Sequence, residues 1–265
     1  MPLSNDAWII RTLWIGPELS TIEQLCIKSF LANGHRVELF TYGDVRNIPA
    51  GTVVRDGNDI LGEDKVFLYR GHRTYAGFAN WFRYLMLYKE GGVWVDIDIV
   101  CLKPFNFDTD FFVGLELPDR VNCAVIGTKP GKELMEFLAN QAENPNRWLP
   151  YDGIREKRQK LRRRFLEGNQ RGNIKWGETG PKGLTKALKY FDLFHTALPV
   201  NAFYPIDIKK WMTVFDGSLA DVSLSFPGSY AIHLWNNMMC SDPEFSKDGS
   251  FPENSIIEQL KRRYL

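Results

Sequence analysis

The sequence predicts an α/β domain with a mostly parallel sheet. In the first half of the chain, short apolar runs of strand length alternate with longer segments whose apolar residues recur at helical spacing. Strands that are joined in this way by crossover helices run parallel to one another. Ligands of such sheets bind at the carboxyl ends of the strands, so we expect the functional residues there.

Turn and capping residues mark the boundaries of the elements. The apolar run Ile9–Ile15 ends at Gly16-Pro17 and is expected to be a strand, and helical spacing follows over Ile22–Phe30 as far as Asn33-Gly34. A helix at Tyr75–Lys89 is expected to end at Gly91-Gly92. The other expected elements are strands at Arg36–Tyr42, Thr52–Arg55, Val93–Cys101, Phe111–Leu115 and Ala124–Thr128, and a helix at Lys132–Gln141.

Composition limits the class of protein. The 265 residues are 44% hydrophobic and 14% aromatic, which supports a large core, excludes a disordered chain and favours a single domain over residues 1–265. The formal net charge of +1 gives no overall attraction to nucleic acid. Four cysteines without a CxxC pair exclude a disulfide framework and a structural zinc site, and predict buried free thiols.

Two further segments bear on location and partners. No apolar stretch reaches the ~18 residues of a membrane span, and the first eleven residues show no export signal, so a cytoplasmic location is expected. A basic helical excursion is expected at about 150–175. A solvated helix face is the simpler interpretation, and contact of residues 155–164 with anionic lipid at the inner face of the membrane, or with an acidic polymer, is the alternative. Nucleic acid ranks third, because no aromatic residues are interleaved for stacking.

Two aspartates interrupt the apolar run at residues 93–101. Strand alternation places Asp96 and Asp98 on one face, ~7 Å apart, so their charges repel and need a cation or hydrogen-bond donors. Oxygen ligands of this kind suit Mg²⁺ or Mn²⁺, which can also bind a diphosphate. The tripeptide alone is as consistent with aspartates that cap a loop or pair with Lys103.

The preceding helix adds two polar residues. Asn80 and Arg83 lie three positions apart, so both side chains leave the same side of an otherwise apolar helix. An arginine in such a helix needs an anion or a carboxylate as partner. A core ion pair between Arg83 and Asp96 is one interpretation, and contact with a bound anion is the other.

The run FANWFRYLMLYKEGGVWVDIDIVCLKPF, Phe78–Phe105, resembles the DXD sugar-nucleotide-binding region of glycosyltransferase family 32, the relatives of the α-1,4-galactosyltransferases and, more remotely, of the clostridial glucosylating toxins. Arg83, Gly91-Gly92, Asp96 and Asp98 match the family pattern, whereas Asn80 stands where many members carry aspartate. Further matches are LWIG at residues 13–16, Asn122–Ala124, TGPKGLT at 179–185 and AIHLWN at 231–236.

The resemblance implies a GT-A fold with a Rossmann-like sheet, and transfer of a sugar from a nucleotide donor, usually linked to uridine diphosphate, with retention. It implies that Asp98 and Asp96 bind Mn²⁺ or Mg²⁺, that Asp96 also contacts the ribose, and that His233 completes the metal shell; a core histidine is the simpler interpretation of His233. Arg83 would steady the diphosphate or the donor sugar.

Other residues become candidates for the donor site. Thr12 and Trp14 would hold ribose and uracil, Asn80 and Asn122 would offer amides to the donor, and Trp235 would donate its indole N–H to the diphosphate. The turn at Thr179 and Gly180 could present backbone N–H groups to an oxyanion. Strand packing, a turn or a core position explains Trp14, Asn122 and Trp235 nearly as well.

Other classes of protein fit less well. A glycoside hydrolase places its two carboxylates on opposite sides of the scissile bond, about 5 Å or more apart. The run GTKPGKE from Gly127 has the wrong spacing for a phosphate-binding loop. The sequence therefore predicts a metal-dependent retaining glycosyltransferase with a glycan or lipid-linked glycan acceptor and, by analogy, a role in polysaccharide biosynthesis. A non-catalytic or degenerate nucleotide-sugar-binding protein is the alternative, because of Asn80.

Overall fold

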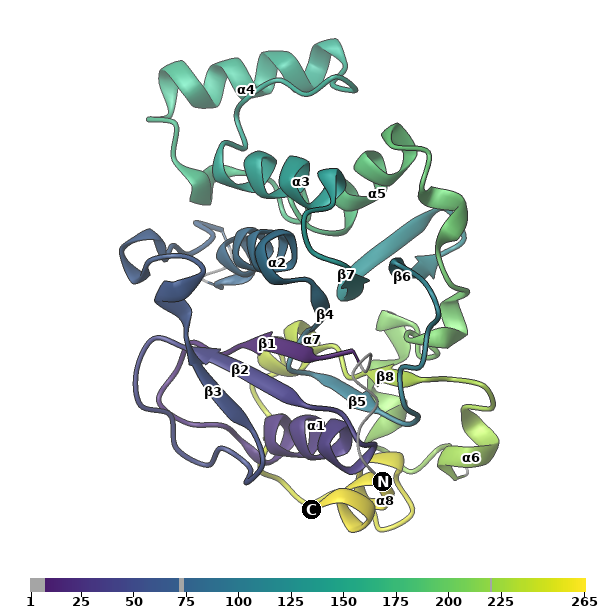
Figure 1. Cartoon of the computed structure of the whole chain (residues 1–265). Helices are drawn as coiled ribbons and strands as arrows, with labels where there is room; N and C mark the ends of the chain where they lie inside the picture. The colour runs from purple at the N-terminus through teal and green to yellow at the C-terminus, as the bar shows by residue number, and fades with distance from the viewer. Residues whose placement is uncertain (1–7, 72–73, 220) are drawn as a thin grey trace. The chain divides into compact units, whose positions relative to one another are not determined.

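The computed structural model describes residues 8–71, 74–219 and 221–265, so most of the N-terminal stretch considered above lies outside the described residues (Figure 1). The chain divides into two compact units. The first unit consists of Met1–Asp56, Val93–Thr109 and Leu198–Leu265, and the second of Gly57–Gly92 and Asp110–Ala197. The single domain expected from the sequence stays a prediction.

The first unit contains the parallel sheet that the sequence predicts. Its strands are β1 (Ile10–Leu13), β2 (Val37–Thr41), β3 (Val53–Asp56) and β4 (Gly92–Val95), in the spatial order β3-β2-β1-β4. All three pairings are parallel, and Ile10 of β1 lies opposite both Val37 and Val93. The connection from β1 to β2 is α1 (Thr21–Ala32), which begins with a capping box between Ser20 and Glu23. The α/β class is confirmed.

The prediction of one strand over Val93–Cys101 is wrong. The chain leaves the sheet after β4, turns at residues 96–98 and continues as β5 (Ile99–Cys101), which pairs with β8 (Ala231–His233) in a separate antiparallel sheet. The turn is closed by a hydrogen bond from the Ile99 N–H to the Asp96 carbonyl at 3.1 Å. No glycine or proline marks this turn, so the sequence pattern predicts one strand where the structure has two, β4 and β5.

Helices from the end of the chain complete the core of the first unit. They are α6 (Val222–Ser225), α7 (Asn236–Ser241) and α8 (Ile256–Tyr264), with 3₁₀ turns at Val200–Ala202 and Ile208–Val214. Ile22 and Leu25 of α1 share one buried cluster with Ile232 of β8 and Leu260 of α8. This cluster fixes β8 against α1 and so holds the C-terminal part of the unit in place.

The second unit is built from helices around one hairpin. The hairpin consists of β6 (Phe111–Leu117) and β7 (Arg120–Thr128), which pair antiparallel, with Phe112 opposite Gly127. The helices are α2 (Ala76–Glu90), α3 (Glu133–Glu143), α4 (Ile154–Leu166) and α5 (Pro181–Tyr190), with 3₁₀ turns at Gly57–Asp59, Glu63–Lys65, Arg171–Asn173 and Phe194–Thr196. Helix α2 packs against α3, and α5 packs against β7.

The basic excursion is helical, as expected, but it is not solvated on every side. Lys160 and Arg163 of α4 are buried, whereas most of the other basic residues of this helix are exposed. The prediction of buried thiols is confirmed for Cys26, Cys101 and Cys123 and wrong for Cys240, which is exposed. Among the described residues, no helix has both the length and the apolar composition needed to cross a bilayer.

A buried carboxylate joins the first three strands of the parallel sheet. Glu38 of β2 is 1% exposed and accepts a hydrogen bond from Nε of Arg11 on β1 at 2.8 Å. Arg36 and Arg55 lie 2.7 and 3.3 Å from the same carboxylate. A buried charge without its partner is strongly destabilising. A shift in strand register would separate these charges, so the cluster stabilises the observed register.

We expect Glu38→Gln to lower the free energy of unfolding by about 3 kcal/mol, because it removes the charge that the buried Arg11 guanidinium faces. Urea denaturation at pH 7 measures this loss. The matched control is Glu18→Gln, which breaks an exposed pair with Arg46 and should cost less than about 1 kcal/mol. Equal losses in the two variants would contradict the structural role of Glu38.

Candidate functional site

Three side chains with metal-ligating atoms meet at the turn between β4 and β5. Asp96, Asp98 and His233 each offer one ligand atom, and these three atoms lie within 4.8 Å of one another. Asp98 and His233 are buried, and Asp96 is half-buried. The structure therefore brings together the three residues that the resemblance implies as metal ligands.

The pairing of β5 with β8 creates this arrangement. Ile99 lies opposite His233, and the N–H of Leu234 donates to the backbone carbonyl of Asp98 at 3.0 Å. The same register brings Nε2 of His233 to 3.1 Å from Oδ2 of Asp98. Because two strands fix both residues, the side chains are positioned by the fold and need no ligand to meet.

A backbone turn in the left-handed region follows β8. Trp235 adopts φ +60° and ψ +57°, an uncommon conformation for a residue other than glycine. This turn starts α7 and directs the N–H of Asn236 to Oδ2 of Asp98 at 2.6 Å. Strained backbone of this kind is often found at functional sites, where it fixes the direction of a neighbouring group.

The Asp98 carboxyl is held in its charged form. Burial by itself would raise its pKa, but the charge and hydrogen bond of His233 and the N–H of Asn236 outweigh burial, and the pKa lies below its ordinary value. Lys247 contributes a further positive charge to this environment. A buried carboxylate that stays ionised is a suitable ligand for a divalent cation.

Sequence reasoning missed Lys247 and its partner Glu23. Nζ of Lys247 lies 2.6 Å from Oε1 of Glu23, whose side chain is 1% exposed. Burial would lower the pKa of Lys247, but the charge and hydrogen bond of Glu23, with a contribution from Asp98, raise it above its ordinary value. Glu23 could have been suspected from the Ser20-x-x-Glu23 capping signature, whereas nothing near Lys247 in the sequence marks it.

Asp96 and Trp14 lie at the carboxyl ends of neighbouring strands. Arg11 of β1 is opposite Trp94 of β4, and the chain reaches Trp14 and Asp96 just beyond these strands. Oδ1 of Asp96 accepts a hydrogen bond from Nε1 of Trp94 at 2.7 Å. This edge of the sheet is where ligands of parallel α/β sheets bind.

Two buried polar atoms at the end of β1 have no hydrogen-bond partner within the described part of the chain. Neither Oγ1 of Thr12 nor Nε1 of Trp14 has a hydrogen-bond partner among the residues that the structure describes. A Cβ atom added to Gly16 would lie 3.1 Å from Nε1 of Trp14, so a larger residue would crowd the indole N–H. Buried groups that are unsatisfied by the protein are candidates for contact with a ligand.

The second unit holds another group of predicted site residues. Nη1 of Arg83 donates to Oδ1 of Asn80 at 3.1 Å, and Nδ2 of Asn80 lies 3.4 Å from Oγ1 of Thr179. A Cβ atom on Gly180 would approach Nδ2 of Asn80 to 3.2 Å. The hydroxyl of Tyr69, which the sequence did not indicate, is buried near this group, and burial chiefly raises its pKa to about 12. Asn80, Arg83, Thr179 and Gly180 thus form one cluster.

Two predicted residues have other partners. Asn122 is buried in β7, where its Nδ2 lies 3.3 Å from Oε2 of Glu116 and its Oδ1 accepts from the Ala124 N–H at 2.8 Å. Trp235 donates its indole N–H to the carbonyl of Ile206 at 2.9 Å. The centre of its ring lies 4.2 Å from the centre of the His233 ring. Donor contacts by Asn122 and Trp235 stay predictions, as does the ion pair between Arg83 and Asp96.

The comparison with protein families decides the assignment. Residues 54–113 match the family described as "Glycosyltransferase sugar-binding region containing DXD motif", and residues 169–264 match "Alpha 1,4-glycosyltransferase conserved region". The chain resembles the α-1,4-glycosyltransferase family in both segments. The first match contains Asn80, Arg83, Asp96 and Asp98, and the second contains the segment around His233, so the family resemblance inferred from the sequence is confirmed.

Curated members of this family are similar over most of the chain. Lactosylceramide 4-alpha-galactosyltransferase of Rattus norvegicus is 25% identical over 69% of this chain and 45% of its own length. Alpha-1,4-N-acetylglucosaminyltransferase of Homo sapiens is 21% identical over 79% of this chain and 58% of its own length. The chain thus spans about half the length of these relatives.

Solved structures with a remote likeness are also glycosyltransferases. The glycosyltransferase domain of the YGT toxin aligns with a TM-score of 0.48 and 8% identity, over 73% of this chain and 80% of that domain. PaToxG glycosyltransferase aligns with a TM-score of 0.45 and 15% identity, over 69% of this chain and 68% of that chain.

We expect Asp98→Asn to lower the free energy of unfolding in EDTA at pH 7 by about 2 kcal/mol, because the charged hydrogen bonds of Asp98 are lost. Since the folded-state pKa of Asp98 is depressed, its contribution is present above the unfolded-state pKa of ~3.9 and disappears as the pH falls through the folded-state pKa. The stability gap between wild type and variant should therefore close in acid.

Urea denaturation of both proteins across a series of pH values measures this gap. Asp110→Asn, which removes an exposed carboxylate paired with Lys132, is the matched control and should change little. An Asp98→Asn variant as stable as wild type at pH 7 would show that the carboxylate is not held by the fold.

Proposed function

We propose that the chain is a metal-dependent retaining glycosyltransferase, which transfers a sugar from a uridine diphosphate donor to a hydroxyl group of a glycan. The observation that carries the proposal is the convergence of Asp96, Asp98 and His233 in a chain that matches the DXD sugar-binding region. In the transfer, the bond from the anomeric carbon to the diphosphate breaks, a bond from that carbon to the acceptor oxygen forms, and the acceptor hydroxyl loses its proton to the departing diphosphate or to water. The diphosphate must leave as an anion, so its charge has to be stabilised.

The three converging side chains fit a divalent cation. Two carboxylates and one imidazole, with part of the coordination shell left for other ligands, suit Mn²⁺ or Mg²⁺, and a nitrogen ligand favours Mn²⁺. When bound there, the cation would neutralise charge on the departing diphosphate. Asp98 would hold it directly, Asp96 would hold it and contact the ribose, and His233 would supply the nitrogen. Trp14 and Thr12, with polar atoms that no described residue satisfies, would face the nucleoside.

We also propose a role in donor binding for Arg83, as the family resemblance implies. The Arg83 guanidinium offers N–H groups in a fixed fork, which suits phosphate or sugar oxygens. Asn80 orients Arg83 through the hydrogen bond to Nη1, and Thr179 lies against the amide of Asn80. Asn80 would therefore act as a positioning residue, in place of the aspartate that is common in the family.

The relatives indicate which sugars to test first. Their names specify galactose and N-acetylglucosamine as transferred sugars, an α-1,4 linkage, and lactosylceramide as one acceptor. An α-linked product from an α-linked nucleotide sugar corresponds to retention. We propose uridine diphosphate galactose and uridine diphosphate N-acetylglucosamine as candidate donors, and a glycan or glycolipid hydroxyl as acceptor.

The alternative is a protein that binds a nucleotide sugar without turnover. Asn80 favours it, since an amide stands where many family members carry a carboxylate. The two functions differ in one respect: only a transferase cleaves the donor, either to an acceptor or slowly to water.

We expect the chain to release uridine diphosphate from at least one of these donors when Mn²⁺ is present and to stop when EDTA is added. Asp98→Asn should lower the rate on the order of 100-fold, because stabilisation of the leaving diphosphate depends on that carboxylate. Asp110→Asn, an exposed aspartate outside the group, should match the wild type.

Release of nucleotide diphosphate and binding of the intact donor are measured in parallel. Donor binding without release, with or without glycan acceptors, would support the non-catalytic alternative. Release that continues unchanged in EDTA and in Asp98→Asn would overturn the metal-dependent mechanism.

A further inference from the structure

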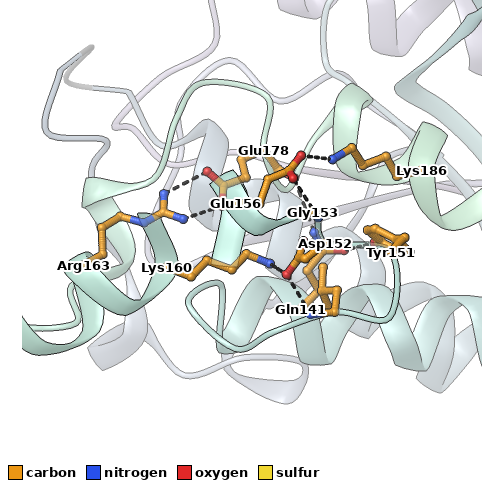
Figure 2. Close-up of polar contacts among 10 residues, drawn as sticks. Gln141, Tyr151, Asp152, Gly153, Glu156, Lys160, Arg163, Glu178 and Lys186 are labelled. Atoms are coloured by element: carbon orange, nitrogen blue, oxygen red, sulfur yellow. Dashed lines mark hydrogen bonds and ion pairs between the residues drawn. The ribbon is translucent and has the colours of Figure 1, made fainter. Parts of the chain in front are cut away.

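Helix α4 turns three of its charged residues towards the protein and part of its apolar surface outwards. The inward face carries Glu156, Lys160 and Arg163, which follow one another at helical spacing. Figure 2 shows the ion pairs that these residues make within the second unit. A surface helix normally buries its apolar stripe and exposes its charges, so the orientation of α4 needs an explanation.

The inward contacts are short and involve buried groups. Lys160 lies 2.6 Å from Oδ2 of Asp152, and both side chains are nearly inaccessible. Arg163 makes two hydrogen bonds to the carboxylate of Glu178, at 2.8 and 2.6 Å (Figure 2). Because breaking a buried ion pair is costly, these contacts fix the rotation of α4 about its axis.

A third pair secures the start of the helix. Glu156 lies 2.7 Å from Nζ of Lys186 on α5, and its second oxygen accepts from the N–H of Gly153, which precedes α4. In Figure 1, α4 lies outside α3 within the second unit. The face opposite the ion pairs is therefore directed away from α3 and α5.

That outer face combines apolar and basic side chains. Ile154, Leu161 and Phe165 are spaced seven and four positions apart, so they form one stripe. Ile154 and Phe165 are each 71% exposed, and Leu161 is 37% exposed. Basic residues flank the stripe: Arg155, Arg158 and Arg162 on one side, and Lys157 and Arg164 on the other.

We propose that this outer face binds the surface of a bilayer that contains anionic lipid. An apolar stripe between basic flanks is the pattern of helices that lie in a membrane interface, where the stripe enters the acyl boundary and the basic groups meet phosphates. Seven of the thirteen residues of α4 are basic and one is acidic, in a chain whose formal net charge is +1. This local excess of positive charge favours an anionic lipid surface over a neutral partner.

An aromatic residue beside α4 extends the surface. Trp148 is 51% exposed, and Nζ of Lys157 lies 5.6 Å from the centre of its ring. Indole rings are enriched at the level of lipid headgroups, because they join an apolar body to a polar N–H. Leu166, 79% exposed at the end of α4, adds further apolar surface.

The test is cosedimentation of the full chain with vesicles of phosphatidylcholine alone and of phosphatidylcholine with phosphatidylglycerol. We expect binding only to the anionic vesicles, weakened by added salt. Arg155→Gln with Arg158→Gln should weaken binding at least tenfold, since each basic residue near such a surface contributes about a fivefold factor. Ile154→Ser with Phe165→Ser should also weaken it at least tenfold.

Matched controls remove exposed positive charges and an exposed apolar side chain outside α4. Lys209→Gln with Lys210→Gln removes two exposed positive charges, and Leu224→Ser removes a leucine that is 72% exposed. Both controls should bind vesicles as the wild type does. Equal binding to neutral vesicles, no binding to anionic ones, or equal loss in controls and α4 variants would overturn the proposal.

A second measurement follows insertion itself. In a Cys240→Ser background, which removes the exposed thiol, a polarity-sensitive dye is attached at Phe165→Cys or, as control, at Leu224→Cys. Anionic vesicles should shift the emission of the dye at position 165 to the blue and leave the dye at position 224 unchanged. A chain that self-associates through this face without binding vesicles would instead identify a second copy as the occupant. None of these assays contains a sugar donor, so their failure leaves the proposed transferase function standing.

Discussion

A buried carboxylate needs partners, and the partners of Asp98 come from the far end of the chain. The β5–β8 pairing supplies His233, and the left-handed turn at Trp235 supplies the N–H of Asn236. These contacts hold the carboxylate charged in an environment that would otherwise favour its neutral form. The contact between Asp98 and His233 in the first unit therefore depends on the register of two short strands, β5 and β8.

The same constraint shapes other parts of the molecule. Glu38 gathers arginines from neighbouring strands, and Glu178 holds Arg163 of α4 through two hydrogen bonds. In each case a buried ion pair favours the packing in which both charges are paired, because any other packing would leave a buried charge without a partner or solvent. At Asp98 the result is a buried carboxylate that stays charged beside His233, and at α4 it is an outward apolar stripe.

Much of the fold could be predicted from the sequence, because strand-length apolar runs and capping residues are local signals. The break between β4 and β5 could not, since it depends on which strand each segment pairs with. The pair Asp96 and Asp98 was recognised from spacing and family resemblance, but the turn, and not strand alternation, brings their carboxylates together. Lys247 was missed because its contact with Glu23 is made by the tertiary structure alone.

The most direct test of the ligand group is pulsed electron paramagnetic resonance of Mn²⁺ bound in the presence of uridine diphosphate. Nitrogen-14 of an imidazole ligand modulates the electron spin echo, whereas oxygen ligands from Asp96 and Asp98 do not. We predict nitrogen modulation in the wild type and its loss in His233→Gln with Mn²⁺ still bound. A wild-type spectrum without nitrogen modulation, or the same modulation in His233→Gln, would contradict the account.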